Sequence, residues 1–514
     1  MLYPIGLQNF EDLRNRSYVY VDKTRHIYNL AATGSYYILS RPRRFGKSLL
    51  LSTMEAYFKG KQELFKGLAI EQMEKEWIKY PVLHLDLNGK KYDIPQALTD
   101  NITYHLDLWE KVYGAGKAND IETRFKEIID AAYEKTGRQV VILIDEYDKP
   151  IVDNLGNPEL AEYYKKTLQG FYSVLKVKDG KIRFGFLTGV SKIGKLSVFS
   201  GLNNLRDISM VGEYADICGL SEDELKNTFD DSVAELGKAN DLTKEECYIK
   251  LKEMYDGYHF SEESKGMYNP FSILNTFSSK EFKEYWFETG TPTLLVEVMK
   301  RTSFDITTLS DNVIVSASAL SGMQDIVNKP VPLFFQTGYL TIKEYDKEYK
   351  EYRLGFPNEE VKNGFLNFIY SYYVPVNPAS DSTKTSQLSR ALKSGNPEAF
   401  MTTLEALFAD TSYQIQGNAE KDFQYAMYII IELLGEYVQA ERTTSNGRID
   451  LLLQTKDYIY LIELKIDNTA ETALQQIEDK GYARPFADDP RKLFKIGVSF
   501  STKNRRIEDW KVMG

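Results

Sequence analysis

The stretch Ser40-Arg41-Pro42-Arg43-Arg44-Phe45-Gly46-Lys47-Ser48 decides how the rest of the chain is interpreted. A short apolar run, residues 36–39, leads into it, and a helix-like run, residues 49–58, follows it. Strand, tight loop, Gly-Lys-Ser and helix is the order of a phosphate-binding P-loop. Main-chain N–H groups at the start of such a helix point at a polyphosphate, and the helix dipole favours its negative charge. The stretch therefore predicts a nucleotide-binding site.

Two side chains of this loop have expected roles. Lys47 would reach the β/γ-phosphates, and the Ser48 hydroxyl would ligate Mg²⁺. The first glycine of G-x-x-x-x-G-K-[ST] is replaced by Arg41, and Pro42 with two further arginines makes the loop stiffer and more basic than usual. The alternative, from this stretch alone, is a helix start with an exposed lysine. The loop residues expected to bind the nucleotide are Arg43, Arg44, Phe45, Gly46, Lys47 and Ser48.

Length and composition describe an ordinary globular protein. The chain has 514 residues, which is too long for one core and allows about three domains. Its residues are 43% hydrophobic and 27% charged, so the chain is not disordered. The net charge of −10 argues against a surface coated for nucleic acid. Any contact with DNA must therefore be a local basic patch.

Metal, disulfide and membrane signals are weak. The two cysteines form no C-x-x-C pair and the four histidines are scattered, so neither a zinc site nor a disulfide framework is indicated. The N-terminus lacks the layout of a signal peptide. The most apolar run, residues 428–431, is interrupted by Glu432 and is too short to span a bilayer. We therefore expect a cytoplasmic protein without a membrane partner.

Acidic and hydroxyl residues follow two further apolar runs. Residues 140–144 read as a buried parallel strand that ends in Asp145 and Glu146, the Walker B layout. Asp145 would hold Mg²⁺ through water, and Glu146 would polarise the attacking water. The alternative is a capped acidic turn. The run 182–187 ends in residues suited to a γ-phosphate sensor, with Thr188 and Ser191 as candidates.

The N-terminal part alternates strands with helices. Asp22 can cap a helix that begins at Lys23, and Gly34 can end it. Residues 82–87 add another strand candidate. Strands alternating with helices predict an α/β, doubly wound sheet with its ligand at the carboxyl ends of the strands.

Several of these stretches together resemble one family, called AAA-ATPase-like. They are Pro4-Ile5-Gly6, Tyr20-Val21-Asp22-Lys23-Thr24, 41–48, Asp145-Glu146-Tyr147-Asp148, Thr188-Gly189-Val190-Ser191 and 200–205. In that family Arg-Pro-Arg-Arg-Phe-Gly-Lys-Ser is the usual P-loop, so the missing first glycine is not a strong objection. The resemblance implies an ATP-binding P-loop domain of the additional-strand class.

The middle of the chain is mostly helical from about residue 220 to 310, and the family resemblance implies a lid behind the ATPase core. Its dense aromatic residues are interpreted as packing. Residues 333–340 and the turn-forming 355–358 allow a small winged-helix-like unit. Residues 377–384 are the best linker candidate. The expected domains are 1–215, 216–375 and 376–514.

The last hundred residues contain a hairpin signal after a helical stretch at 421–435. Residues 447–453 and 458–465 read as its two strands. Glu463 and Lys465 are two apart, so they point to one face, and Asp450 on the partner strand can converge on them. Asp450 and Glu463 would hold Mg²⁺ for phosphodiester hydrolysis, while Lys465 orients or deprotonates water. The alternative is a strand with an exposed Glu–Lys face.

This set resembles the PD-(D/E)xK nuclease superfamily, in the branch fused behind AAA-ATPase-like domains. The following helix carries Gln476, Lys480 and Tyr482, and we expect the first two to be possible nucleic-acid contacts. For the upstream acid that many such nucleases have, Glu432 and Glu436 are candidates.

The favoured function is an ATP-dependent or ATP-gated nuclease with ATP and Mg²⁺ as cofactors and DNA, or another nucleic acid, as partner. One alternative is a nucleotide-operated switch whose nuclease-like end binds nucleic acid without cutting. Another is an inert ATP-binding scaffold. A basic cluster of Lys503, Arg505 and Arg506 fits the first two. A homo-oligomer is compatible with all three.

Overall fold

The computed structural model forms two compact units, residues 1–362 and 363–514. Each unit is described by itself, and the expected division into three domains stays a prediction. The described residues are 1–114, 118–192, 199, 204–289, 298–299, 302, 309, 313–321, 330–373, 381–409, 427, 429–430, 434, 439–441, 451–504 and 506–514.

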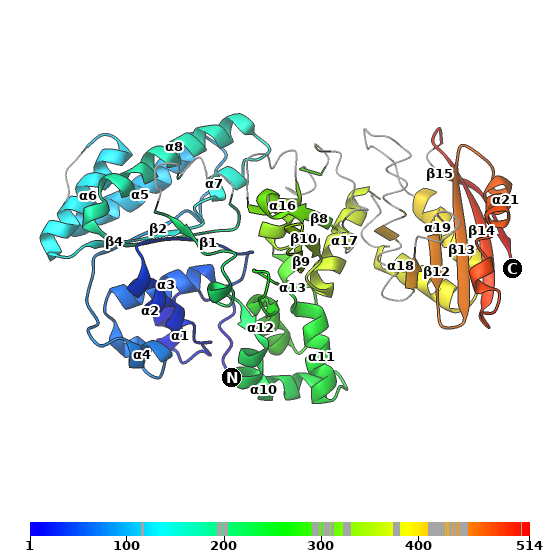
Figure 1. Cartoon of the computed structure of the whole chain (residues 1–514), viewed down its shortest axis with the longest axis horizontal. Helices are drawn as coiled ribbons and strands as arrows, with labels where there is room; N and C mark the ends of the chain where they lie inside the picture. The colour runs from blue at the N-terminus through cyan, green and yellow to red at the C-terminus, as the bar shows by residue number, and fades with distance from the viewer. Residues whose placement is uncertain are drawn as a thin grey trace. The chain divides into compact units, whose positions relative to one another are not determined.

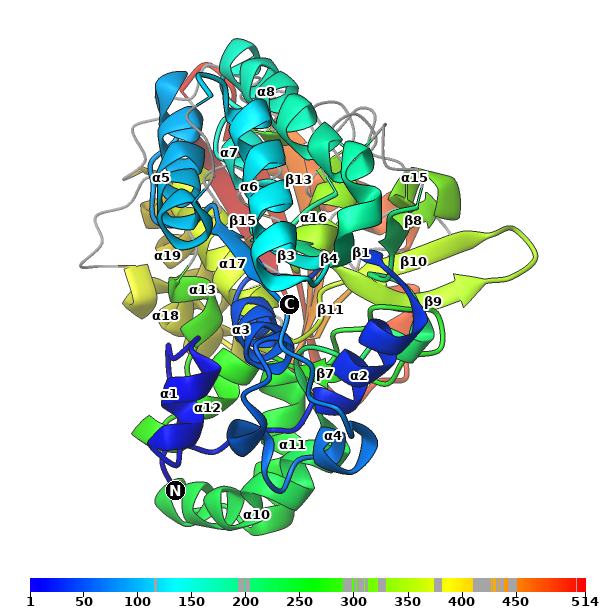
Figure 2. The same cartoon turned by 90° about the vertical axis from the view of Figure 1, so that its left-hand side faces the viewer.

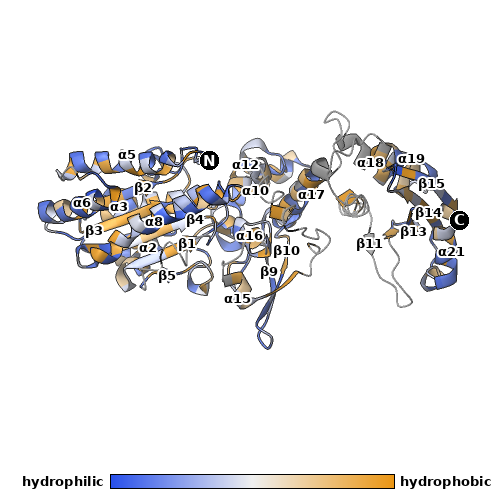
Figure 3. Cartoon of the chain, turned by 90° about the horizontal axis from the view of Figure 1, so that it is seen from above, coloured by the Kyte–Doolittle hydropathy of each residue, from blue (hydrophilic) through white to orange (hydrophobic). Residues whose placement is uncertain are grey.

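A five-stranded parallel sheet is the centre of the first unit (Figure 1). Its order is β2-β3-β4-β1-β5, so β4 lies between the strand that enters the P-loop and the strand that ends in Asp145. This insertion is the additional-strand arrangement, which confirms the expectation. Figure 3 shows the central strands as hydrophobic, in keeping with the complete burial of β1 and β3. The strands are β1 Tyr36–Ser40, β2 Val82–Asp86, β3 Val140–Asp145, β4 Ile182–Gly189 and β5 Arg206–Asp207.

Helices cover both faces of this sheet (Figures 1 and 2). Helix α3 packs on β3 and β4 from one face, and α6 contacts β3 from the other. The predicted helix is confirmed, with its start one residue later and its end before Gly34. Asp22 accepts hydrogen bonds from the N–H and hydroxyl of Thr24, but the N-cap of α2 is Lys23, which makes no side-chain capping bond, so the predicted cap was wrong. The helices are α1 Phe10–Asn15, α2 Thr24–Thr33, α3 Lys47–Phe58, α4 Ala69–Met73, α5 Gln96–Tyr113, α6 Ile121–Thr136, α7 Lys149–Val152 and α8 Pro158–Val177.

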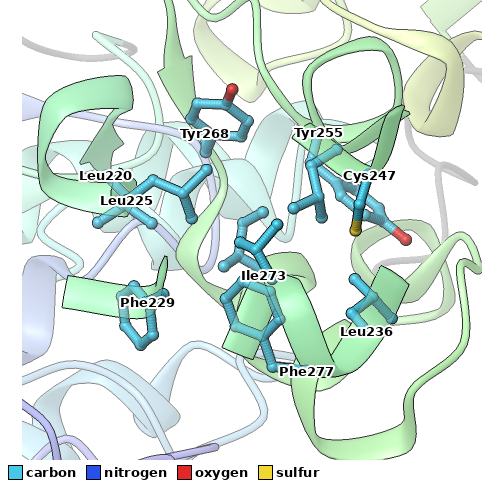
Figure 4. Packing of buried hydrophobic residues seen from close by; sticks show 11 residues of the cluster. Leu220, Leu225, Phe229, Leu236, Cys247, Tyr255, Tyr268, Ile273 and Phe277 are labelled. Atoms are coloured by element: carbon cyan, nitrogen blue, oxygen red, sulfur yellow. The ribbon is translucent and has the colours of Figure 1, made fainter. Parts of the chain in front are cut away.

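A helical lid follows, as expected. Helices α10 and α11 both begin with a capping box, made by Ser221 with Glu224 and by Thr243 with Glu246. Tyr255 and Tyr268 pack with aliphatic side chains of the lid into one core (Figure 4), which confirms the packing interpretation for these two residues. The elements are β6 Leu220–Ser221, α10 Glu222–Ala239, α11 Lys244–Tyr255, β7 Met267–Tyr268, α12 Pro270–Ser279 and α13 Tyr285–Glu288.

A small sheet with two helices completes the first unit. Its antiparallel strands have the order β8-β10-β9, and α15 and α16 lie between β8 and β9 in the chain. Helices followed by a β-hairpin that pairs with an earlier strand make the expected winged-helix-like unit. Its elements are β8 Val313–Ser316, α15 Ala317–Ser321, α16 Pro330–Thr337, β9 Thr341–Asp346 and β10 Glu351–Gly355.

The second unit is an α/β fold around a sheet of order β11-β12-β13-β14-β15. The predicted hairpin is confirmed for β12 and β13, which pair antiparallel with Leu451 opposite Ile462. Strand β13 pairs parallel with β14, and α21 connects them and packs on both. The elements are α18 Asp381–Lys393, α19 Pro397–Ala409, β11 Gln439–Glu441, β12 Leu451–Gln454, β13 Tyr458–Ile466, α21 Ala470–Lys480, β14 Lys492–Ser501 and β15 Arg506–Met513, while α17 Glu359–Tyr373 spans the boundary between the units.

The predicted linker and the predicted helix at 421–435 are described only in part by the structure. Residues 381–384 of the expected linker form the first turn of α18, so this half of the prediction was wrong; residues 377–380 lie outside the described residues. Most of the predicted helix 421–435 also lies outside them. Within the described ranges, no helix has the length and apolar content needed to cross a membrane.

Candidate functional site

The P-loop is shaped by two left-handed residues. Arg44 has φ +67° and Gly46 has φ +92°, and Gly46 is the N-cap of α3. Gly46 adopts this conformation without steric cost because it lacks a Cβ. The turn leaves the first N–H groups of a twelve-residue helix free to face an anion.

Arg41, which replaces the usual first glycine, has a structural role. The residue is 1% exposed, and its guanidinium donates hydrogen bonds to the carbonyl oxygens of Ser40 (3.0 Å), Ser209 (2.7 Å) and Tyr214 (2.9 Å). It also lies 4.0 Å from the centre of the Phe260 ring. Burial lowers the pKa of Arg41 to about 10. The side chain therefore fastens the loop to the segment that follows β5.

The buried Lys47 forms an ion pair with the partly exposed Glu146 at the mouth of the loop. The distance from Lys47 Nζ to Glu146 Oε1 is 3.2 Å, and Nζ also donates to the carbonyl oxygens of Arg41 and Pro42. Glu146 has φ +53°, a strained conformation for a residue with a side chain. Burial raises the pKa of Glu146 to about 7; Lys47 opposes this rise, and Asp148 and Asp145 add to it.

Hydroxyl groups from the end of β4 hold the other two carboxylates. Thr188 Oγ1 donates to Asp145 Oδ1 at 2.5 Å. The N–H and hydroxyl of Ser191 both donate to Asp148 Oδ2 at 2.6 Å. Burial raises the pKa of Asp148, and these hydrogen bonds oppose the rise. Thr188 and Ser191 therefore orient these two carboxylates.

A cavity of about 450 Å³ opens in front of the loop. Six of the predicted residues line it: Arg43, Arg44, Gly46, Lys47, Ser48 and Glu146. Its volume lies within the range of small-molecule sites. Arg44 also stacks over the ring of Phe271, 5.0 Å from its centre. The structure thus brings together the loop and the end of β3, as the sequence predicts.

Four predicted residues do not line this cavity. The Phe45 ring packs edge-to-face against Tyr258 and Phe260, so the side chain faces the protein core and not the cavity. The other three are Asp145, Thr188 and Ser191, which form the layer behind Glu146.

Sequence reasoning missed several neighbours of the loop. Residues 4–8 line the cavity although they precede β1 by about thirty positions. The indole N–H of Trp286 donates to the Arg43 carbonyl at 3.0 Å, and the Trp286 main-chain N–H donates to the buried carboxylate of Glu360. Local sequence patterns do not predict contacts between residues so far apart in the chain. In the sequence, the signal for this neighbour is Pro4-Ile5-Gly6, which belongs to the stretches that carry the family resemblance.

In the second unit, Glu463, Lys465 and Gln476 lie together. Lys465 Nζ is 3.0 Å from Glu463 Oε1, and the Gln476 amide donates to the same oxygen from α21. Glu463 is 1% exposed, whereas Lys465 is partly open to solvent. The alternation expected for a strand therefore places the acid and the lysine on one face. Lys480 is exposed at the end of α21.

The metal-ligand set of this site is incomplete in the described part of the chain. Asp450, Glu432 and Glu436 lie outside the described residues, as does Arg505 of the basic cluster; Lys503 and Arg506 are exposed. Within the described ranges, no three His, Cys, Asp or Glu side chains gather into a metal site. A magnesium site that keeps waters and substrate phosphates as ligands does not require such a cage.

Comparisons with known proteins match one family model within the first unit and another within the second. The family model described as "Predicted AAA-ATPase" matches residues 4–199, and that of the "PD-(D/E)XK nuclease superfamily" matches residues 418–510. A protein of Azotobacter chroococcum mcd 1, described as "Uncharacterized protein in vnfD 5'region", is 37% identical over 516 residues, covering 98% of this chain and 97% of its own.

Two solved structures from Aeropyrum pernix also match. One is the ORC1 protein in complex with DNA, with 8% identity over 68% of this chain and 93% of its own. The other is the ORC2 protein in ADPNP–ADP complexes, with 11% identity over 70% and 93%. Both TM-scores are 0.25, too low to carry an argument, so the fold assignment depends on the sheet and loop described above. The near full-length relative and the two family models show that the chain belongs to the AAA-ATPase-like proteins that carry a C-terminal PD-(D/E)XK nuclease superfamily domain.

Proposed function

We propose that the first unit binds and hydrolyses ATP with Mg²⁺ in the 450 Å³ cavity. The observation that carries this proposal is the Lys47–Glu146 ion pair, which lies at the start of α3 inside that cavity. A buried lysine and a carboxylate in one cleft beside free helix N–H groups provide a cation for phosphate and a base for water.

The pair also suggests a sequence of events. In the absence of nucleotide, Glu146 neutralises Lys47. When the β/γ-phosphates arrive, Lys47 turns to them, and Glu146 is released to orient the attacking water. Ser48 lines the cavity and would ligate Mg²⁺ directly, while Asp145, in the layer behind, would hold the ion through water; the ion would neutralise charge on the phosphates. Thr188 holds Asp145 in place throughout, which makes it a positioning residue.

For the second unit we propose metal-dependent cleavage of a phosphodiester in DNA or another nucleic acid. Asp450 and Glu463 would hold the ion, and Lys465 would orient or deprotonate water. Gln476 keeps the Glu463 carboxylate in its orientation. Gln476 and Lys480 are the proposed contacts to the nucleic acid.

One observation favours the alternative, a switch that binds nucleic acid without cutting it. Glu463 is buried and its Oε1 contacts Lys465 and Gln476, so the carboxylate has partners within the protein that do not depend on a metal. The two functions differ in a single respect, which is whether the phosphodiester is broken.

The test is an assay of the full chain with single- and double-stranded DNA, Mg²⁺, and either ATP or no nucleotide. Cleavage that is absent from Lys465→Ala protein purified in the same way supports the nuclease. DNA binding without cleavage, under every nucleotide condition, supports the switch. ATP hydrolysis measured in the same samples tests the first unit, with Glu146→Gln as the variant that should bind ATP and hydrolyse it far more slowly.

A further inference from the structure

A separate cavity of about 200 Å³ lies at the opposite end of the helix that follows the P-loop. Helix α3 begins at the loop with Lys47, and its last two residues, Tyr57 and Phe58, line this cavity. The other walls come from the second half of α2, the connection between α4 and β2, and the start of β4; α2, α3 and α4 lie on the same side of the sheet (Figures 1 and 2). Among the described residues, none lines both this cavity and the nucleotide cavity, so both can hold a ligand at the same time.

Aromatic rings form much of the wall. The Phe58 ring packs edge-to-face against Tyr57 and against Tyr80, with ring centres 4.9 and 6.0 Å apart. Tyr28 adds a fourth ring from α2. Aromatic side chains offer flat apolar faces on which a nucleobase can stack, whatever the base. The wall therefore suits a flat heterocycle, and the polar groups of the cavity must decide which one.

Arg183 supplies hydrogen-bond donors. Its Nη2 donates to the carbonyl oxygen of Ala31, in the last turn of α2, at 2.7 Å, which holds the guanidinium at the wall of the cavity. Within the described part of the chain, its Nε and Nη1 donate to no protein acceptor, so donors remain for a ligand. The base contact that arginine makes most often is with O6 and N7 of guanine, two acceptors side by side.

Two carboxylates also line the cavity, and they differ in what they contact. The Glu74 side chain accepts hydrogen bonds from the Tyr57 hydroxyl at 2.5 Å and from the N–H groups of Lys75 and Glu76, each at 2.8 Å. The Glu76 side chain is exposed and, in the described ranges, takes part in no hydrogen bond or ion pair. A carboxylate of this kind can accept both the N1–H and the N2–H₂ donors of guanine.

We propose that this cavity binds a guanine base, stacked on the aromatic wall, with O6 and N7 toward Arg183 and the N1 and N2 donors toward Glu76. Adenine fits less well, because it carries an amino group in place of O6 and a bare acceptor at N1 that would face the carboxylate. A phosphate group is disfavoured inside the cavity because two carboxylates line it. The guanine can belong to a free nucleotide or to a single strand, and the proposal does not depend on ATP binding at the P-loop.

Calorimetry on the full chain with guanosine and adenosine tests this, because neither probe has a phosphate for the P-loop to hold. We expect guanosine to bind at least about tenfold more tightly than adenosine. Glu76→Gln should lower the affinity for guanosine about tenfold, whereas Glu63→Gln, at another exposed glutamate that does not line the cavity, is the matched control and should not change it. Tyr80→Leu should also lower the affinity about tenfold, since it removes one stacking face.

Two further probes separate the sources of the base: guanosine monophosphate, and a five-nucleotide single strand with one central guanine between thymines. Tighter binding of the strand supports a guanine in single-stranded nucleic acid, and tighter binding of the monophosphate supports a free nucleotide. Guanosine that binds no more tightly than adenosine would overturn the proposal, as would equal affinities of the parent and the Glu76→Gln protein. Guanosine binding that is lost in Lys47→Ala protein would locate the base at the P-loop and overturn the proposal as well.

Discussion

Replacing Arg41 by glycine would bring the loop closer to the usual P-loop motif, yet we expect Arg41→Gly to destabilise the first unit. The side chain makes three hydrogen bonds to carbonyl groups and stacks on Phe260. Each hydrogen bond contributes about 1 kcal/mol, and a desolvated cation–π contact about 2 kcal/mol. Glycine adds a cost of up to about 1 kcal/mol in chain entropy.

One effect acts in the opposite direction. Burial lowers the pKa of Arg41 from 12.5 to about 10, so the charged form is less favourable here than in water by about 3 kcal/mol. That penalty disappears with the side chain. The losses still exceed the gain, and the expected net loss of stability is about 3 kcal/mol.

Denaturant unfolding followed by tryptophan fluorescence measures this loss in the relevant unit. Trp77, Trp109 and Trp286 lie in residues 1–362, and the fourth tryptophan lies in the second unit. Arg43→Gly is the matched control, because Arg43 is exposed in the same loop and should cost no more than the chain entropy of glycine. An Arg41→Gly protein as stable as the Arg43→Gly protein would refute the structural role of Arg41.

Three further predictions concern the two sites. Lys47→Ala should lose most ATP affinity in calorimetry while the fold survives, and unchanged affinity would remove the P-loop assignment. The folded pKa of Glu146, about 7, lies above its ordinary value of 4.5. The contribution of this group to the free energy of unfolding is therefore present at low pH and falls by about 3 kcal/mol as the pH rises from about 4.5 to 7. In unfolding experiments without nucleotide or Mg²⁺, Glu146→Gln should remove that fall, and identical pH profiles of the variant and the parent would contradict this prediction. In the second unit, Asp450→Ala should lose the metal, while Lys465→Ala should keep it and lose cleavage; nuclease activity that persists in both would eliminate the site.

The buried strands could be predicted because a strand that is buried on both faces has an uninterrupted run of apolar residues in the sequence. Residues 140–144 are uninterrupted aliphatic side chains, and the strand they form is completely buried. Strand β5 leaves no such trace. It has two residues, Arg206 and Asp207, and is held by pairing with Tyr37 and Ile38 of β1, so only the tertiary structure defines it.

The P-loop and the end of β3 could likewise be predicted, because the chemistry of the site requires particular residue types at fixed spacing. The contacts that support the loop could not. Arg41 reaches Ser209 across 168 positions, and Trp286 reaches Arg43 across 243. Spacing rules apply within a turn or a helix, and they carry no information over such separations.

These supports make the loop dependent on the lid and on the winged-helix-like unit. The Arg43 carbonyl is held by Trp286, whose main chain is held in turn by Glu360 in the first turn of α17. Gly338, at the end of α16, has φ +90°, and an added Cβ there would lie 2.7 Å from the Pro42 ring. A loop without its first glycine thus takes its shape from residues about 240 to 300 positions later. Any shift of the loop that a phosphate causes must change these contacts, and the free energy of that change acts equally in reverse, from the lid on the affinity for the nucleotide.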